Sequence, residues 1–328
     1  MRGQALHIVT GGAGFIGSNV AADLAARGAR VVVIDRLEQG EKWRNLAEVA
    51  LYDVIPPEVA WRFFAGAADR IAAIVHMGAI SATTETDVDK LVRENIRFSL
   101  DLWEHCAAKA IPFFYASSAA TYGDGAAGFE DDAAPEGLAR LTPLNAYAWS
   151  KHVVDRRIAR DAREGLACPP RWAGLKFFNV YGPREAHKGP MRSVALQIFE
   201  AIQEGRPVRL FRSHRPDFAD GGQLRDFVAV QDCVSVLRWM LEASFPSGLY
   251  NVGTGQARSW LDLAHAVFAA CGRAPKIDFI DTPEPLRARY QYFTEADMRR
   301  LRAAGYQQPF LSLEAGVAAY VRWLQGAR

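Results

Sequence analysis

A glycine-rich turn near the start of the chain limits the possible folds more than any other feature. The turn, Thr10-Gly-Gly-Ala-Gly-Phe-Ile-Gly17, stands between an apolar run from Ala5 to Thr10 and an amphipathic stretch from Phe15 to Arg27. The run is typical of a buried strand and the stretch of a helix. Arg30 to Ile34 predicts a second strand, which ends at Asp35. Together these segments predict a βαβ unit and therefore a parallel sheet.

The glycines of this turn suit a dinucleotide. Gly11 permits the tight turn, Gly14 lets the backbone approach a pyrophosphate, and Gly17 lets the helix pack on the strand. The amide groups at the helix N-terminus add hydrogen-bond donors and partial positive charge. Because the turn follows a strand, opens a helix and precedes an acidic strand end, we expect a dinucleotide site that includes Phe15 and Ile16. The alternative is an ordinary tight turn.

Further segments extend the sheet. Apolar runs predict strands at Ala72 to His76, Pro112 to Ala116, Ala173 to Asn179 and Gly248 to Gly253, and amphipathic stretches predict helices at Trp260 to Ala270 and Leu313 to Leu324. We expect an α/β fold, a doubly wound parallel Rossmann sheet with a smaller C-terminal substrate-binding lobe. The expected division is 1–179 plus about 226–255 for the cofactor domain, and 180–225 plus about 256–328 for the lobe.

Composition narrows the class of partner. The chain has 328 residues, half of them hydrophobic, which is more than one domain usually holds. Its 39 basic and 37 acidic side chains give a formal charge of +2, which argues against nucleic acid and membrane surfaces as partners. The four cysteines show no metal-binding spacing, so no metal is expected. There is no room for a signal peptide and no apolar run that could span a membrane, so we expect a cytoplasmic protein with a small partner.

Residues after the second strand bear on the choice of cofactor. Asp35 would bond the adenosine ribose, but Arg36 and Lys42 can pair with a 2′-phosphate, which favours NADP over NAD. The alternative is that both cations are simply solvated on a surface loop. Gly78-Ala-Ile-Ser81 follows the strand that ends at His76, so Gly78, Ala79 and Ser81 are expected close to the cofactor.

A tyrosine and a lysine four residues apart carry the expected chemistry, in Tyr147-Ala-Trp-Ser-Lys151. On a helix they face the same way, so the ammonium can lower the pKa of the phenol and bond the nicotinamide ribose. Ser118 follows an apolar strand, at the end where open sheets bind ligands, and can hydrogen-bond a substrate hydroxyl or carbonyl. With the glycine turn upstream, this set predicts hydride transfer with Tyr147 exchanging a proton.

Further motifs give the chain a resemblance over nearly its whole length to the extended short-chain dehydrogenase/reductases. Asn179-Val-Tyr-Gly-Pro-Arg184 is similar to the loop after that family's catalytic helix, and Arg225-Asp-Phe-Val228 resembles its diphosphate-binding segment. Three stretches, Ser117 to Gly123, Asn179 to Gly189 and Ala288 to Asp297, resemble the ADP-glycero-manno-heptose 6-epimerase family within it. That family inverts C6″ of an ADP-sugar by transient oxidation and re-reduction with bound NADP, in lipopolysaccharide biosynthesis.

The resemblance also implies roles for single residues. It makes Lys188 a second acid/base group beside Tyr147, which is chemically sound if the pocket desolvates the lysine; the alternatives are a solvated charge or a phosphate contact. The resemblance adds three residues to the cofactor site: Asn95, Val180 and Lys188. It places the following in the substrate site: Ser81, Ser118, Asn179, Pro190, Gln197, Phe211, Arg212, Arg225 and Tyr290. Tyr290 has an ordinary core aromatic as its alternative. The resemblance also implies a homo-oligomer, with a pentamer as one candidate.

Other activities and some departures stay open. Ala119 and Ala120 stand where sugar-nucleotide 4,6-dehydratases carry an Asp-Glu pair, so elimination is not expected. A 4-epimerase, which uses one tyrosine and would not require Lys188, or a reductase of the same family is the alternative enzyme. A non-catalytic NADP-binding sensor is the alternative outside enzymes. Departures from the heptose epimerases fall at Met77, at Pro190 and Gln197, and at an apparent insertion from Arg215 to Gly222.

Overall fold

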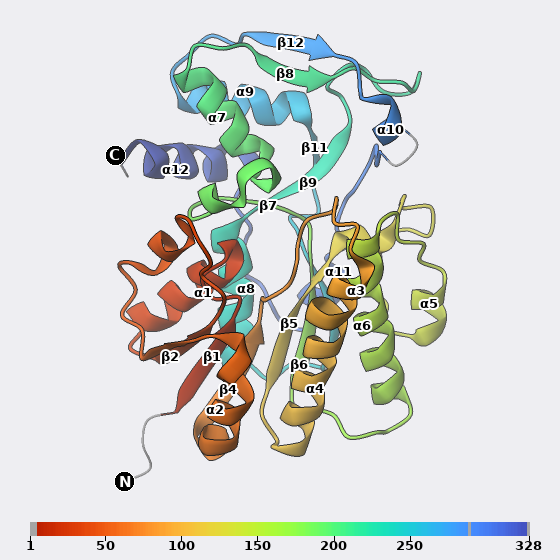
Figure 1. The fold of residues 1–328 in the computed structure, drawn as a ribbon. Coiled ribbons are helices and arrows are strands. Elements are labelled where there is room, and N and C mark those ends of the chain that lie inside the picture. The colour runs from red at the N-terminus through yellow and green to blue at the C-terminus, as the bar shows by residue number, and fades with distance from the viewer. Residues whose placement is uncertain (1–4, 288–289, 327–328) are drawn as a thin grey trace.

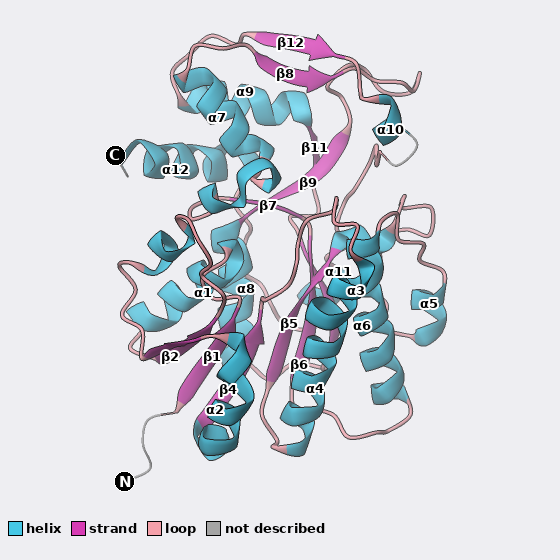
Figure 2. Ribbon diagram, viewed as in Figure 1, coloured by secondary structure: helices cyan, strands magenta, loops and turns pink. Residues whose placement is uncertain are grey.

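Seven parallel strands form the central sheet of the protein (Figure 1, Figure 2). The computed structural model describes residues 5–287 and 290–326. In sheet order the strands are β10 (Gly248–Val252), β6 (Trp172–Phe177), β5 (Phe113–Ser118), β4 (Ile71–His76), β1 (Leu6–Thr10), β2 (Arg30–Ile34) and β3 (Asp53–Ile55). The order confirms the predicted doubly wound α/β class. It places the topological switch between β1 and β4, where open sheets of this kind bind ligands.

Helices cover both faces of this sheet, each over its own apolar cluster. On one face lie α2 (Ala60–Ala67), α4 (Phe98–Ala108) and α6 (Ala146–Arg163), with α3 (Val88–Leu91) and α5 (Pro135–Ala139) against α6. On the other face lie α1 (Phe15–Ala26), α8 (Val230–Glu242) and α11 (Arg299–Ala303). Strand residues alternate between the two clusters, so that Ile8 faces one and Val9 the other. The continuous apolar runs of the sequence follow from this two-sided burial.

A smaller lobe stands over the carboxyl ends of the sheet (Figure 1). It contains a sheet of β7 (Asn179–Tyr181), β9 (Leu224–Ala229) and β11 (Ala257–Ser259), and a parallel pair of β8 (Val208–Phe211) and β12 (Ile277–Ile280). Its helices are α7 (Val194–Gln203), α9 (Trp260–Ala270), α10 (Glu284–Arg287) and α12 (Leu313–Gly326), and a third apolar cluster joins α7, α9 and α12. None of the helices in the described ranges combines the length and the apolar character needed to cross a membrane.

Several short helical turns connect these elements. They are the 3-10 turns η1 (Lys42–Leu46), η2 (Pro57–Val59), η3 (Ala68–Arg70), η5 (Ala119–Tyr122) and η6 (Ala186–Met191), and the π-helical turn η4 (Val92–Arg97). Two of them, η1 and η6, meet at the mouth of the site described below.

The predicted strand from Ala173 to Asn179 is in fact two strands. Strand β6 ends at Phe177 in the central sheet. Asn179 then begins β7, which pairs with β9 in the small sheet. At the crossing, the Phe178 amide still donates to the Val252 carbonyl (3.1 Å). An apolar run looks the same whichever sheet it joins, so the sequence did not mark this point.

Candidate functional site

A cleft of about 820 Å³ opens at the carboxyl ends of β1, β4 and β5 and is roofed by η6. This volume is in the range of small-molecule and cofactor sites. Many of the residues predicted from the sequence line it: Gly11, Gly14, Phe15, Ile16, Gly17, Asp35, Lys42, Gly78, Ala79, Ser81, Ser118, Tyr147, Lys151, Val180 and Lys188.

The glycine turn has room for backbone alone. Gly11 has a φ of +62°, which favours glycine, and a Cβ there would run into the Gly78 backbone. A Cβ on Gly17 would run into the Gly11 carbonyl. The turn therefore brings the start of α1 close to the loop after β4. It leaves a backbone cradle that suits the pyrophosphate of a dinucleotide.

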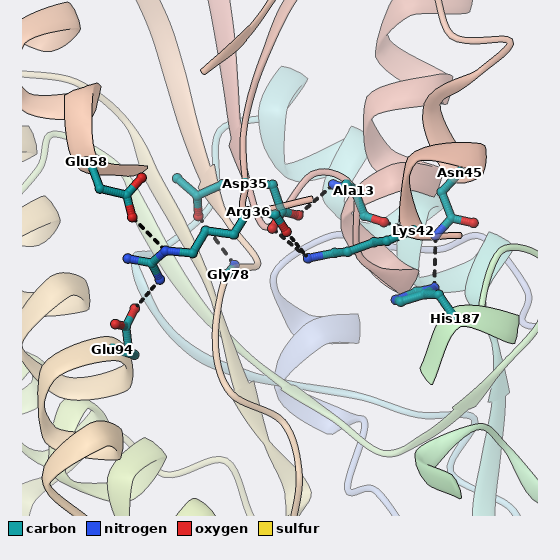
Figure 3. A network of polar contacts seen from close by, with 10 residues as sticks. Ala13, Asp35, Arg36, Lys42, Asn45, Glu58, Gly78, Glu94 and His187 are labelled. Carbon is teal, nitrogen blue, oxygen red and sulfur yellow. Dashed lines mark hydrogen bonds and ion pairs between the residues drawn. The ribbon is translucent and has the colours of Figure 1, made fainter. Parts of the chain in front are cut away.

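Asp35 fixes the end of β2 beside this cradle (Figure 3). Its carboxylate accepts a hydrogen bond from the Ala13 amide (2.8 Å) and pairs with the Lys42 ammonium (2.6 Å). Arg36 points away from Lys42, and its guanidinium pairs with Glu58 (2.7 Å) and Glu94 (2.9 Å). Of the two cations predicted to select the cofactor, Lys42 lines the cleft while Arg36 is tied to carboxylates outside it.

Asn95 lies behind the cleft wall, fully buried within η4. Its side-chain amide accepts from the Ile80 amide (2.8 Å) and donates to the Ile80 carbonyl (3.0 Å), which clamps the Gly78–Ser81 loop. It also donates to the Ser150 hydroxyl (3.0 Å), which in turn donates to the Tyr147 carbonyl (2.7 Å). Asn95 therefore joins the loop to the first turn of α6, and its direct contact with a cofactor stays a prediction.

Ser118, Tyr147 and Lys151 come together on one wall. Asn145 caps α6 by accepting from the Ala148 amide (2.9 Å), which orients the turn that carries Tyr147. Burial raises the pKa of Tyr147, and a hydrogen bond with Ser118 opposes that rise. Lys151 donates to the Ala116 carbonyl (2.7 Å), and burial lowers its pKa to about 8. The expected lysine effect on the phenol is not among the causes that set the pKa of Tyr147 here.

A buried ion pair supports this wall from behind, and the sequence reasoning missed it. Lys176 on β6 and Asp155 on α6 are both fully buried and pair at 2.9 Å. Asp155 also accepts from the hydroxyls of Tyr115 (2.9 Å) and Ser117 (2.6 Å). Asp155 follows Lys151 by one helical turn, so the spacing of Tyr147, Lys151 and Asp155 along a single face could have revealed it.

Lys188 reaches the cleft from a different wall, on η6. Its ammonium lies 5.4 Å from the centre of the Phe15 ring, and burial lowers its pKa despite the opposing charge of Glu185. A desolvated amine of this kind can exchange protons near neutral pH more readily than a solvated one. The cleft thus receives two groups able to exchange a proton, Tyr147 and Lys188, from separate elements.

The predicted substrate residues of the lobe lie outside the cleft lining. Arg225 is buried between the rings of Trp260 (5.5 Å) and Tyr290 (5.3 Å), and Tyr290 also meets Phe211 edge to face. The Arg225 guanidinium donates to the carbonyls of Leu224 and Gln291 and has no carboxylate partner in the described part of the chain. These contacts place Arg225, Tyr290 and Phe211 in one cluster.

The remaining substrate predictions are more dispersed. Arg212 is exposed and donates to the Phe279 carbonyl (3.3 Å). Asn179 opens β7 opposite Phe227, Pro190 is exposed in η6, and the amide of Gln197 donates to the Arg192 carbonyl (3.0 Å).

The structure also locates two of the departures from the heptose epimerases that the sequence showed. The segment from Arg215 to Gly222 is part of the lobe, in the connection between β8 and β9, with Arg215 over the ring of Tyr292 (5.1 Å) and paired with Asp217. Met77 lines the cleft. In the motif from Ala288 to Asp297, Ala288 and Arg289 lie outside the described residues.

Comparisons with known proteins agree with this geometry. Residues 7–253 match the NAD dependent epimerase/dehydratase family. The ADP-L-glycero-D-manno-heptose-6-epimerase of Nitratidesulfovibrio vulgaris is 48% identical over 329 residues, which cover 97% of each chain. The crystal structure of the enzyme of that name from Helicobacter pylori has a TM-score of 0.80 at 28% identity and covers 99% of this chain and 97% of its own. A Thermus thermophilus UDP-glucose 4-epimerase in complex with NAD has a TM-score of 0.78 at 27% identity, with 98% of this chain and 100% of its own covered.

Proposed function

Because the chain belongs to the NAD dependent epimerase/dehydratase family, we propose that it inverts C6″ of ADP-glycero-manno-heptose by transient oxidation and re-reduction with a bound nicotinamide cofactor. The observation that carries the proposal is the meeting of Tyr147 and Lys188 in one cleft from separate elements. An inversion that returns hydride to the other face of a carbonyl needs proton exchange in two positions, and two acid/base groups supply it.

The cofactor site fits a dinucleotide. The glycine turn and the N-terminus of α1 would hold the pyrophosphate, Asp35 and Lys42 the adenosine end, and Lys151 the nicotinamide ribose. A nicotinamide held there would supply the acceptor, and then the donor, of the C6″ hydride. We favour NADP, with NAD as the alternative, because the Lys42 ammonium in the cleft can pair with a 2′-phosphate.

The proton steps belong to this chain's side chains. As C6″ is oxidised, the hydroxyl proton passes to one of the two groups, and as the carbonyl is reduced on its other face, the new hydroxyl takes its proton from the other group. Ser118, which hydrogen-bonds Tyr147, would orient the reacting oxygen on the Tyr147 wall. Burial lowers the pKa of Lys188 and so favours its neutral form as a proton acceptor.

The lobe would hold the rest of the substrate. Arg225 is a buried cation whose only partners in the described chain are backbone carbonyls and aromatic rings, which suits the diphosphate of an ADP-sugar. Asn179 and Tyr290 would bound the sugar. The two-part division of the chain and a homo-oligomeric assembly are parts of the same proposal.

Incubation of the purified protein with ADP-glycero-manno-heptose tests the proposal, with C6″ configuration followed by NMR. We expect inversion, and a loss of about 10²- to 10⁴-fold in kcat for Tyr147→Phe and for Lys188→Met. Lys90→Met, a change of an exposed lysine that is not among the residues lining the cleft, is the matched control and should keep full activity. No inversion by the wild-type protein would refute the assignment. Full activity of Lys188→Met would refute only the two-base step and favour a one-tyrosine epimerase.

A further inference from the structure

The segment that carries Lys188 is fastened to the cofactor side of the cleft through Asn45 (Figure 3). The side-chain amide nitrogen of Asn45 lies 2.9 Å from the Ala13 carbonyl oxygen, in the glycine turn, and 3.0 Å from Nδ1 of His187. Beside this contact, the Arg184 guanidinium donates to the backbone carbonyl of Asn45. A chain of contacts therefore runs from the pyrophosphate cradle through Asn45 to the residue next to Lys188.

Hydrogen-bond counting fixes the form of the His187 ring. The Ala13 carbonyl can only accept, so the amide of Asn45 must present its NH₂ group there. That group has two hydrogens; one goes to Ala13 and the other points to Nδ1 of His187. Nδ1 must then be the acceptor, which requires a neutral imidazole that carries its proton on Nε2.

The surroundings of the ring favour that neutral form. Burial lowers the pKa of His187, and the charges of Lys42 and Lys188 lower it further. The Arg184 carbonyl and the carboxylate of Asp35 act in the opposite direction but do not reverse the result. Protonation would place an N–H on Nδ1 facing the NH₂ of Asn45, two donors with no acceptor between them, and the contact would break.

We propose that His187 is a positioning residue: the neutral ring, latched to Asn45, holds Lys188 in the cleft and links its position to the glycine turn. This inference rests on the proposed function for the role of Lys188. This contact between His187 and Asn45, the latch, joins residues 142 positions apart. At one end it reaches the glycine turn through Ala13, and at the other His187 lines the cleft next to Lys188, the proton-exchanging group that it adjoins in sequence. Loss of the latch should therefore harm the proton step of Lys188 and spare that of Tyr147.

Single-turnover reduction of the bound nicotinamide, measured separately with each C6″ epimer, separates these two effects. In a two-base inversion each epimer gives its hydroxyl proton to a different group. We expect His187→Leu to slow cofactor reduction by one epimer about 10- to 100-fold, because a misplaced group is costly, and to leave the other within about twofold. The slowed epimer should be the one that Lys188→Met also slows. His187→Gln keeps an acceptor for Asn45 and should restore most of the rate. Equal slowing with both epimers, or no slowing with either, would overturn the latch.

A second measurement needs no turnover. In the ¹⁵N-histidine NMR spectrum of the cofactor-free wild-type protein, the His187 signals are identified by their absence from the His187→Leu spectrum. We expect the Nε2–H tautomer at neutral pH. A proton on Nδ1 would overturn the inference. If the wild-type protein reduces its cofactor with neither epimer, the proposed function fails, while the tautomer still decides whether the latch exists.

Discussion

Two buried cations, one in the central sheet and one in the lobe, differ in whether a carboxylate pairs with them. Lys176 in the central sheet is fully buried beside the carboxylate of Asp155, and its ammonium also donates to the Thr121 hydroxyl (2.6 Å). Arg225 in the lobe is 6% exposed, yet within the described chain it has only carbonyls and aromatic rings around it. A buried charge is costly unless it is paired. Lys176 is thus complete within the fold, whereas Arg225 has capacity left for an anion.

The same difference runs through both regions. The cofactor half offers a ligand the backbone of the glycine turn and a few cleft side chains such as Tyr147 and Lys151, while the charges buried beneath them, Lys176 and Asp155, pair with each other. The lobe offers an arginine and several rings, which come from the strands β8 and β9, from the start of α9 and from the loop at Tyr290. The buried charges Lys176 and Asp155 of the first half, the framework, are paired within the fold, whereas the buried charge of the lobe has an open position for an anion of the substrate.

The sharpest way to break the contrast is to remove Lys176. In Lys176→Met, Asp155 is left buried without its cation, and we expect the free energy of unfolding to fall by about 3–5 kcal/mol. Urea denaturation measures it. The double change Lys176→Met with Asp155→Leu should recover most of the loss. A single-variant loss below about 1 kcal/mol would show that the pair is not what completes this site.

Acid titration tests a second self-contained group of the framework, the Asp131 carboxyl, which is buried and accepts from the Asn251 amide (2.8 Å). Burial raises the pKa of Asp131 to about 6, against about 3.9 in an unfolded chain. The native state therefore binds more protons than the unfolded state between those values, so this group's stabilising contribution is present below about pH 4 and is lost as the pH rises to about 6.

Asp131→Asn keeps the acceptor and removes the titration. The wild type should lose stability between pH 4 and pH 7.5, and Asp131→Asn should not. The stability of the variant relative to the wild type should therefore be higher at pH 7.5 than at pH 4, by up to about 3 kcal/mol. Asp132→Asn, at the exposed neighbour, should show no such trend. Parallel stability curves for Asp131→Asn and the wild type across this range would contradict the assignment.

Removing Arg225 should have the reverse outcome from removing Lys176. For Arg225→Met we expect stability to be kept or raised, because an unpaired buried charge is removed. The KM for the ADP-sugar should rise about 10- to 100-fold through loss of charge-assisted bonds to the diphosphate. Cofactor affinity, measured by fluorescence titration, should not change. Arg209→Met, at an exposed arginine of β8, is the control. A large loss of stability with unchanged KM would reverse the comparison.

The smallest effect concerns Lys42, a side chain that the framework does offer to a ligand. Lys42→Ala should weaken NADP binding about tenfold and NAD binding little, because only NADP carries the 2′-phosphate. Isothermal titration with both cofactors measures the ratio. An equal loss of affinity for NADP and NAD would show that Lys42 only holds Asp35 in place. The control Lys90→Ala should change neither affinity.

Much of the framework could be predicted because its signals are local. The glycine turn, the strand from Arg30 to Ile34 and the helix from Trp260 to Ala270 are found where the pattern placed them. The strand break after Phe177 and the short edge strand β3 were missed. A run of apolar residues does not say which sheet it joins, and β3, with only Ile55 of its residues buried, gives almost no pattern.

The sequence by itself determined the class of fold, the glycine cradle, and the placing of Tyr147 and Lys151 on one helix face, because each depends on spacing within a few turns of chain. Only the tertiary structure decided that Lys176 meets Asp155, that His187 meets Asn45, and that Arg36 turns away from the cleft while Lys42 faces it. These contacts join residues that are distant in sequence or depend on which carboxylates lie nearby. Such pairings follow from how the layers pack, which no local periodicity encodes.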